Sequence, residues 1–124
     1  MAWSFTSDRA VYLQIAERIK KSVLSGVYPP GGQIPSVRQL ALEAAVNPNT
    51  VQKAFTELEN QGIILSRGTL GRYVTEDTET IEACRMEMAR QYVRVFLNDI
   101  RQLGIPQSQA IDMIKEAENE SIGM

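Results

Sequence analysis

The segment PSVRQLALEAAVNPNTVQKAFTEL, residues 35–58, contains two helix starts separated by a short turn. Ser36 precedes the first apolar stripe and Asn47-Pro48 precedes the second; Ser and Asn are strong N-caps, and Pro suits the first helical position. Two helices joined by about four residues form a helix-turn-helix pattern. The stripes, at helical steps of three and four, comprise Val37, Leu40, Ala41 and Ala44, then Val51, Ala54, Phe55 and Leu58.

Both sides of this segment extend the pattern. Before it, apolar residues at helical spacing predict a helix over residues 11–25, with Asp8 as its N-cap and Gly26 as its end. After it, residues 63–75 form two β-prone runs around a glycine-containing loop, which predicts a β-hairpin. Three helices followed by a hairpin form a winged helix-turn-helix, so we expect a mostly α-helical fold of the α+β class.

The remaining chain predicts a helical tail. A long helix is expected over residues 79–103 and a shorter one after Pro106. The shorter helix can cover only part of the apolar stripe on the longer one, and uncovered apolar stripes of this size mark interfaces. We therefore expect residues 1–75 to form a DNA-binding domain and residues 76–124 a dimerisation tail. The stripe comprises Ile81, Cys84, Met88, Tyr92, Val95, Phe96, Ile100 and Leu103.

Composition excludes several classes of function. The 124 residues are 44% hydrophobic and 23% charged, which is typical of a soluble globular domain. The chain has no His and one Cys, which excludes His-dependent triads, His-ligated metals and an internal disulfide. No apolar run reaches the ~18 residues of a membrane span, and the N-terminus lacks a signal segment. We expect a cytoplasmic protein that is not an enzyme, needs no cofactor and has no membrane partner.

Charge is distributed unevenly along the chain. Residues 1–75 carry eight Lys or Arg against five Asp or Glu, a net charge of +3. Residues 76–124 carry five against ten, a net charge of −5, so the total is −2. This asymmetry suggests two tasks, and the basic half is the one suited to phosphate.

The second helix of the helix-turn-helix is the strongest candidate for base recognition. Its apolar stripe points inward, which leaves polar residues exposed on its first turn and a half, the part that enters the major groove. Asn and Gln can pair with adenine, Thr can contact a thymine methyl or a phosphate, and Lys can reach guanine or a phosphate. The alternative is a capped surface helix facing water, but the flanking elements favour nucleic acid. These candidates are Asn49, Thr50, Gln52 and Lys53.

Further candidates precede and follow this helix. Arg38 lies in the first turn of its helix, where a cation is mildly unfavourable, so a DNA phosphate would explain it; the alternative is a solvated arginine. Ser36 is a predicted cap that can also contact phosphate. In the wing, glycine permits close approach to the DNA backbone and arginine favours the minor groove, whereas the alternative is a tight turn with solvated arginines. The wing candidates are Arg67, Gly68, Thr69, Gly71 and Arg72.

Four segments resemble GntR-type bacterial transcription regulators, and the short two-helix tail resembles the YtrA-like subfamily. The segments are Tyr12-Leu13-Gln14-Ile15-Ala16, Pro35-Ser36-Val37-Arg38-Gln39-Leu40-Ala41, Val46-Asn47-Pro48-Asn49-Thr50-Val51 and Leu58-Glu59-Asn60-Gln61-Gly62. The resemblance covers nearly the whole chain. It implies a homodimeric winged-helix regulator, most often a repressor, with double-stranded operator DNA as its partner. Carried over, the DNA contacts fall on Ser36, Arg38, Asn49, Thr50, Gln52, Lys53 and the wing at residues 67–71.

The chain departs from the family pattern at two places. Ala44-Ala45 stands where the family commonly has Leu-Gly. If that turn needs a positive φ, Ala45 is strained by roughly 1 kcal/mol; otherwise the turn has changed shape. The wing usually reads Arg-Gly-x-Gly-x-Phe-Val, but here an extra residue separates Gly68 from Gly71, and Tyr73 replaces Phe.

The leading hypothesis is a sequence-specific transcriptional repressor that binds a pseudo-palindromic operator as a homodimer. The alternatives are a winged-helix scaffold that binds an acidic protein and, less favoured, a small enzyme. A small-molecule effector stays unknown. A tail of roughly 45 residues cannot enclose a pocket of about 300 Å³ within one subunit, so an effector would bind between subunits or be absent.

Overall fold

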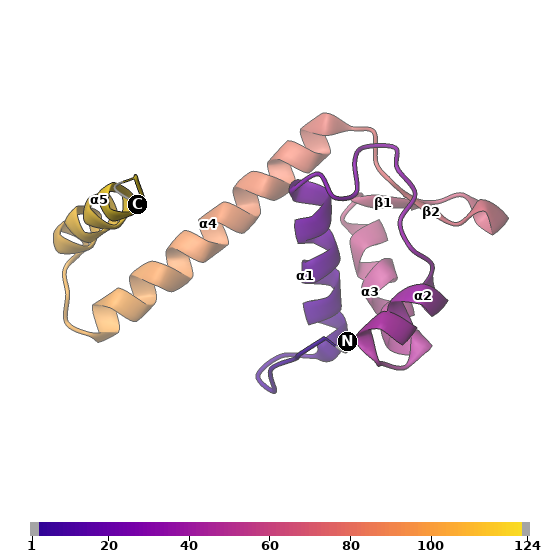
Figure 1. Cartoon of the computed structure of the whole chain (residues 1–124), viewed down its shortest axis with the longest axis horizontal. Helices are drawn as coiled ribbons and strands as arrows, with labels where there is room; N and C mark the ends of the chain where they lie inside the picture. The colour runs from indigo at the N-terminus through magenta and orange to yellow at the C-terminus, as the bar shows by residue number, and fades with distance from the viewer. Residues whose placement is uncertain (1–2, 123–124) are drawn as a thin grey trace. The chain divides into compact units, whose positions relative to one another are not determined.

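A computed structural model describes residues 3–122, without the side chains of residues 121 and 122. It contains five α-helices and a two-stranded antiparallel sheet, which confirms the winged helix-turn-helix followed by two helices (Figure 1). The elements are α1 (Val11–Leu24), α2 (Val37–Ala44), α3 (Pro48–Asn60), β1 (Ile64–Ser66), a 3₁₀ turn (Gly68–Leu70), β2 (Arg72–Val74), α4 (Thr78–Gln102) and α5 (Gln107–Ile122).

The chain forms two compact units, residues 1–84 and residues 85–124. The first contains α1 to β2 and the start of α4, and the second contains the rest of α4 together with α5. The division at residue 75 stays a prediction. None of the helices in the described part of the chain is long and apolar enough to cross a membrane.

The starts of α2 and α3 are fixed by the side chains that the sequence predicts. Ser36 Oγ accepts a hydrogen bond from the backbone N–H of Gln39 at 3.1 Å, and Gln39 Oε1 accepts one from the Ser36 N–H at 2.9 Å. This pair is a complete capping box. At α3, Asn47 Oδ1 accepts from the Asn49 N–H at 2.8 Å, and Pro48 occupies the first helical position. These caps set where each helix begins, and therefore which residues form its first turn.

The turn between α2 and α3 keeps the left-handed conformation that the family provides with glycine. Ala45 has φ 59° and ψ 49° and follows the last residue of α2. Its backbone N–H donates to the carbonyl of Ala41. The turn therefore does need a positive φ, and the Cβ of Ala45 costs about 1 kcal/mol of strain.

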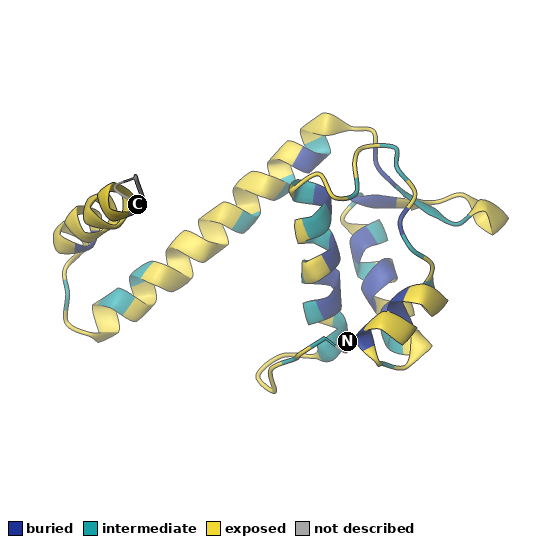
Figure 2. Ribbon diagram, viewed as in Figure 1, coloured by how far each residue is buried: buried dark blue, intermediate teal, exposed yellow. Residues whose placement is uncertain are grey.

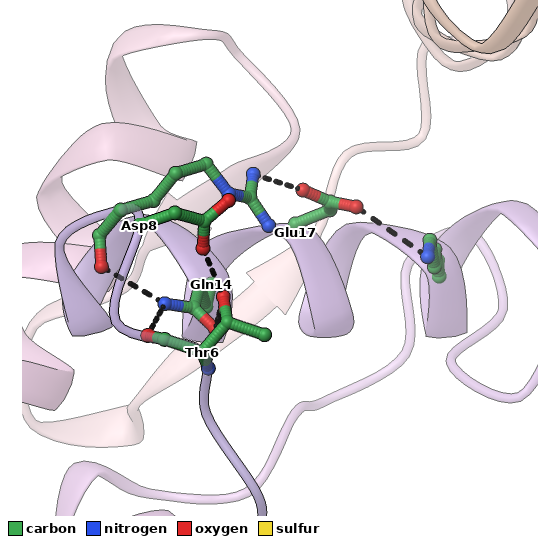
Figure 3. A network of polar contacts seen from close by, with 6 residues as sticks. Thr6, Asp8, Gln14 and Glu17 are labelled. Atoms are coloured by element: carbon green, nitrogen blue, oxygen red, sulfur yellow. Dashed lines mark hydrogen bonds and ion pairs between the residues drawn. The ribbon is translucent and has the colours of Figure 1, made fainter. Parts of the chain in front are cut away.

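The prediction that Asp8 caps α1 is wrong. The residue at the N-cap position is Ala10, whose side chain has no hydrogen-bonding group. Asp8 instead accepts a hydrogen bond from the Thr6 hydroxyl, which lowers the pKa of its carboxyl group (Figure 3). Gln14 Nε2 holds the segment that precedes α1 by donating to the carbonyls of Thr6 and Arg9, at 2.9 Å each. No side chain caps α1; Asp8 bonds to Thr6 instead, and Gln14 ties the residues before the helix to its first turns.

The apolar stripes of the first three helices meet the hairpin in one core (Figure 2). The largest fully buried side chains are Phe55, Ile15, Ile19, Leu40, Leu58, Ile63, Ile64, Val51 and Val74. Ile81 from the first turn of α4 joins this core with 6% of its surface exposed, and Cys84 packs partly against it. The first two positions of the tail stripe are therefore packed within the first unit.

The hairpin is tied to the loop that leads into α2. The backbone N–H of Gly31 donates to the carbonyl of Val74 at 3.0 Å, and the Val74 N–H donates to Gly32 at 2.8 Å. The Ile34 N–H donates to the carbonyl of Arg72 at 3.0 Å. Because β2 is bonded to β1 on one edge and to this loop on the other, the wing and the start of α2 are held together.

Candidate nucleic-acid interface

The first turn and a half of α3 presents polar side chains to solvent. Asn49, Gln52 and Lys53 are exposed, and Thr50 is half-buried. The opposite face of α3 is fixed, because Val51, Ala54, Phe55 and Leu58 are fully buried. A helix anchored in this way can project its polar face into a major groove without losing core contacts.

Lys53 is held in place by an aromatic ring from another helix. Its Nζ lies 4.9 Å from the ring centroid of Tyr12 in α1, within the range of a cation–π contact. This pair could not be predicted from spacing, because Tyr12 and Lys53 are far apart along the chain. The contact restrains a cation beside the exposed residues of α3.

The start of α2 places two more candidates on the surface. Ser36 and Arg38 are both exposed. Ser36 Oγ accepts a hydrogen bond as a cap, so its hydroxyl proton stays available to a phosphate. Within residues 3–122, Arg38 has no ion-pair partner, so its whole guanidinium group is available to a phosphate.

An open depression of about 610 Å³ joins the start of α2 to the wing. Tyr28 lines this depression, and burial raises the pKa of its hydroxyl. The depression brings together candidates that are more than thirty residues apart in the sequence. Its lining includes Tyr28, Gln33, Ser36, Arg38, Gly71 and Arg72.

Arg72 is directed toward the protein rather than away from it. Its Nε donates to Glu59 Oε1 at 2.8 Å, and its guanidinium carbon lies 4.9 Å from the ring centroid of Phe55. Only 22% of the side chain is exposed. Arg72 therefore braces β2 against α3, and only its terminal nitrogens remain for a phosphate. The sequence could not show this pairing, because it depends on how the wing folds back.

The tip of the wing is exposed. Arg67, Gly68 and Thr69 are accessible, and the Arg67 guanidinium carbon lies 4.5 Å from the ring centroid of Tyr73. Tyr73, which replaces the Phe of the family pattern, thus supports this arginine through a cation–π contact. Gly71, by contrast, is half-buried.

The tail has apolar residues at its surface. Phe96 and Leu103 are 38% and 73% exposed, although both are large apolar side chains. Tyr92 and Val95 are also exposed, while Met88 and Ile100 are half-buried. These six are the stripe positions left after Ile81 and Cys84 have packed in the first unit. The second helix of the tail, α5, has 16 residues against 25 in α4.

The part of the chain that the structure describes contains no cluster of three or more residues suited to a metal. What it does contain is a winged helix with polar and cationic groups on the start of α3, the start of α2 and the wing. These features define a DNA-binding protein of the winged helix-turn-helix class.

Comparison with known proteins identifies the family. Residues 11–74 match the family described as "Bacterial regulatory proteins, gntR family". The HTH-type transcriptional repressor YtrA of Bacillus subtilis (strain 168) is 35% identical over 111 residues, covering 89% of this chain and 85% of YtrA. The chain therefore belongs to the GntR family of DNA-binding transcriptional regulators, whose named relatives are regulators rather than enzymes.

Solved structures agree with this assignment. A GntR family transcriptional regulator from Listeria monocytogenes superposes with a TM-score of 0.82 at 37% identity, covering 90% of this chain and 98% of that one. The DNA-binding domain of AraR, solved in complex with operator ORX1, superposes with a TM-score of 0.53 at 26% identity. That comparison covers 58% of this chain and 93% of the AraR domain.

Proposed function

We propose that this regulator is a repressor that binds a pseudo-palindromic operator as a homodimer. The observation that carries the proposal is the orientation of α3. Its apolar face is fully buried, and the side chains best suited to read bases stand exposed on its first turns. The AraR domain bound to its operator supports DNA as the partner.

Base recognition is assigned to the start of α3. Asn49 and Gln52 carry amides that can donate to and accept from one adenine edge. Lys53, restrained over Tyr12, is placed for guanine or a phosphate, and Thr50 for a thymine methyl or a phosphate. Gln52 is the leading base-reading residue, because it is exposed and lies one turn into the helix.

Backbone contacts are assigned to the start of α2 and to the wing. Ser36 and Arg38 lie beside the depression that β2 also lines, so one DNA strand can contact both elements. Phosphate contacts of this kind fix the register of a protein on the duplex without reading sequence. The wing contributes Arg67, Gly68, Thr69 and Gly71, with the terminal nitrogens of Arg72.

Dimerisation is assigned to the exposed stripe of α4. Apolar surface of this extent marks an interface, and a two-fold partner is the commonest way to cover it. A two-fold dimer presents two recognition helices to half-sites about 34 Å apart, which explains a pseudo-palindromic operator. The interface is proposed at Met88, Tyr92, Val95, Phe96, Ile100 and Leu103.

The sign of regulation and the location rest on analogy. YtrA carries the name of a transcriptional repressor, and the proposed repressor role of this chain rests on that similarity. The proposed cytoplasmic location follows from operator DNA as the proposed partner.

The proposal is tested by selecting bound sites from random DNA duplexes with the full chain. We expect an inverted repeat of one short motif, with half-site centres separated by about 10 base pairs or a multiple of that number. Binding without any enriched motif would contradict the proposal and favour a scaffold whose basic face meets an acidic protein.

A further inference from the structure

The wing of this chain carries an apolar side chain at its tip. Residues 67–71 read Arg-Gly-Thr-Leu-Gly, and Leu70 is their one apolar side chain. It ends the 3₁₀ turn formed by Gly68–Leu70, and 66% of its surface is exposed. Single exposed leucines are common on proteins, so exposure alone assigns no role to Leu70.

The structure also fixes the position of this leucine. Gln33 Nε2 donates a hydrogen bond to the backbone carbonyl of Leu70 at 2.8 Å. The Arg67 N–H donates to the carbonyl of Gly71 at 2.8 Å, which closes the turn. Gly71 has φ 98°, and a Cβ on it would lie 2.9 Å from Gln33 Nε2, so only glycine allows Gln33 to approach this closely. The backbone that carries this leucine therefore loses little conformational freedom when it binds.

The surroundings of Leu70 continue the proposed DNA surface. Arg67, at the base of the same turn, makes a cation–π contact with the Tyr73 ring. Gln33 and Gly71 line the depression that also contains Ser36 and Arg38. The occupant that fits an apolar tip flanked by arginine is therefore the minor groove next to a half-site, where arginine and apolar side chains are both used.

We propose that Leu70 is a specificity-determining contact that enters the minor groove and disfavours G·C pairs there, with Gln33 as its positioning residue. The proposal rests on the proposed DNA-binding function. In the minor groove a G·C pair differs from A·T by the 2-amino group of guanine, a hydrogen-bond donor. An apolar side chain that covers this donor removes it from water and offers no acceptor, which weakens binding.

The test measures the affinity of the full chain for duplexes that share one operator but differ in the flanking pairs beside each half-site. Each flanking pair in turn is A·T, G·C or inosine·C. Inosine keeps the major-groove edge of guanine but lacks its 2-amino group. We expect one position at which G·C weakens binding by about fivefold or more and inosine·C restores it. If G·C and inosine·C behave alike at every flanking position, the proposal is wrong.

Two variants assign this discrimination to residues. Leu70→Ser should bind A·T, G·C and inosine·C flanks with equal affinity. Leu65→Ser is the matched control, since Leu65 is also exposed and lies on β1 of the same hairpin, and it should keep the discrimination. A Leu70→Ser protein that still distinguishes G·C from inosine·C would overturn the role of Leu70.

Gln33→Glu keeps the size of the side chain but replaces the donor to Leu70 with an acceptor. We expect it to reduce flank discrimination while the preference at bases read by α3 stays unchanged. Unchanged discrimination in this variant would remove Gln33 as a positioning residue. Selective binding to the half-sites with no response to inosine would refute this inference alone, whereas loss of all selectivity in the wild type would refute the proposed function.

Discussion

Ala45 holds a backbone conformation that glycine adopts without steric cost. We expect Ala45→Gly to raise the free energy of unfolding, because glycine relieves strain of about 1 kcal/mol at this positive φ. The net gain is smaller than that, because glycine also increases the conformational entropy of the unfolded chain. Urea unfolding of the full chain measures this change. The control is Ala44→Gly, next to it but helical and buried, which should be destabilising. If Ala45→Gly lowers the free energy of unfolding, the claim that Ala45 is strained is wrong.

Gln52 carries the main prediction about base reading. We expect Gln52→Ala to relax the preference at one position of each half-site, at a cost of about 1–3 kcal/mol in binding. Selection of bound sites with the variant measures the preference directly. Asn60→Ala, at the other end of α3, should leave the selected motif unchanged. If every position of the motif keeps its information in Gln52→Ala, this residue does not read a base.

The start of α2 is assigned a phosphate contact through Arg38. We expect Arg38→Ala to weaken binding to all DNA sequences about equally and to reduce the salt slope by about one. Affinity measured across a salt series tests this. Lys115→Ala on α5 removes the same charge outside the proposed contact set and should leave the slope unchanged. A changed motif with an unchanged slope would place Arg38 on a base instead.

The elements were largely predictable from the sequence, because caps and apolar spacing act within a few residues. Ser36, Asn47 and the stripe of α3 were predicted in this way and are confirmed. Asp8 does not cap α1, because its carboxylate accepts from the Thr6 hydroxyl instead. Which of these partners it meets depends on the path of the residues that precede α1.

Contacts between elements could not be predicted from spacing. The pair Arg72–Glu59 and the bond from Gln33 to Leu70 join residues that only the folded wing brings together. Ile81 shares the helical spacing of the tail stripe, so the pattern could not show that it packs in the winged-helix core. The sequence predicts which polar residues share the exposed face of α3. The contacts that hold the candidate residues in place, such as Lys53 with Tyr12 and Arg67 with Tyr73, are visible only in the structure.

The exposed stripe of α4 predicts that the chain associates with a second copy of itself. We expect Phe96→Asp to be monomeric at micromolar concentration, because a carboxylate within a two-fold apolar interface is left without water or a partner. Sedimentation equilibrium measures the mass. Asn98→Asp adds a carboxylate to the same helix away from the stripe and should stay dimeric. A monomeric wild type, or a dimeric Phe96→Asp, would contradict the assignment of the tail.

The number of chains bound to one operator distinguishes a dimer on a two-fold site from a single bound chain. Native mass measurement of the full chain on the selected operator should give two copies per duplex. A duplex with a single half-site should bind at least about 100-fold more weakly, because the second contact is then lost. One copy per operator, with equal affinity for the single half-site, would contradict a dimer that reads a two-fold site through α3.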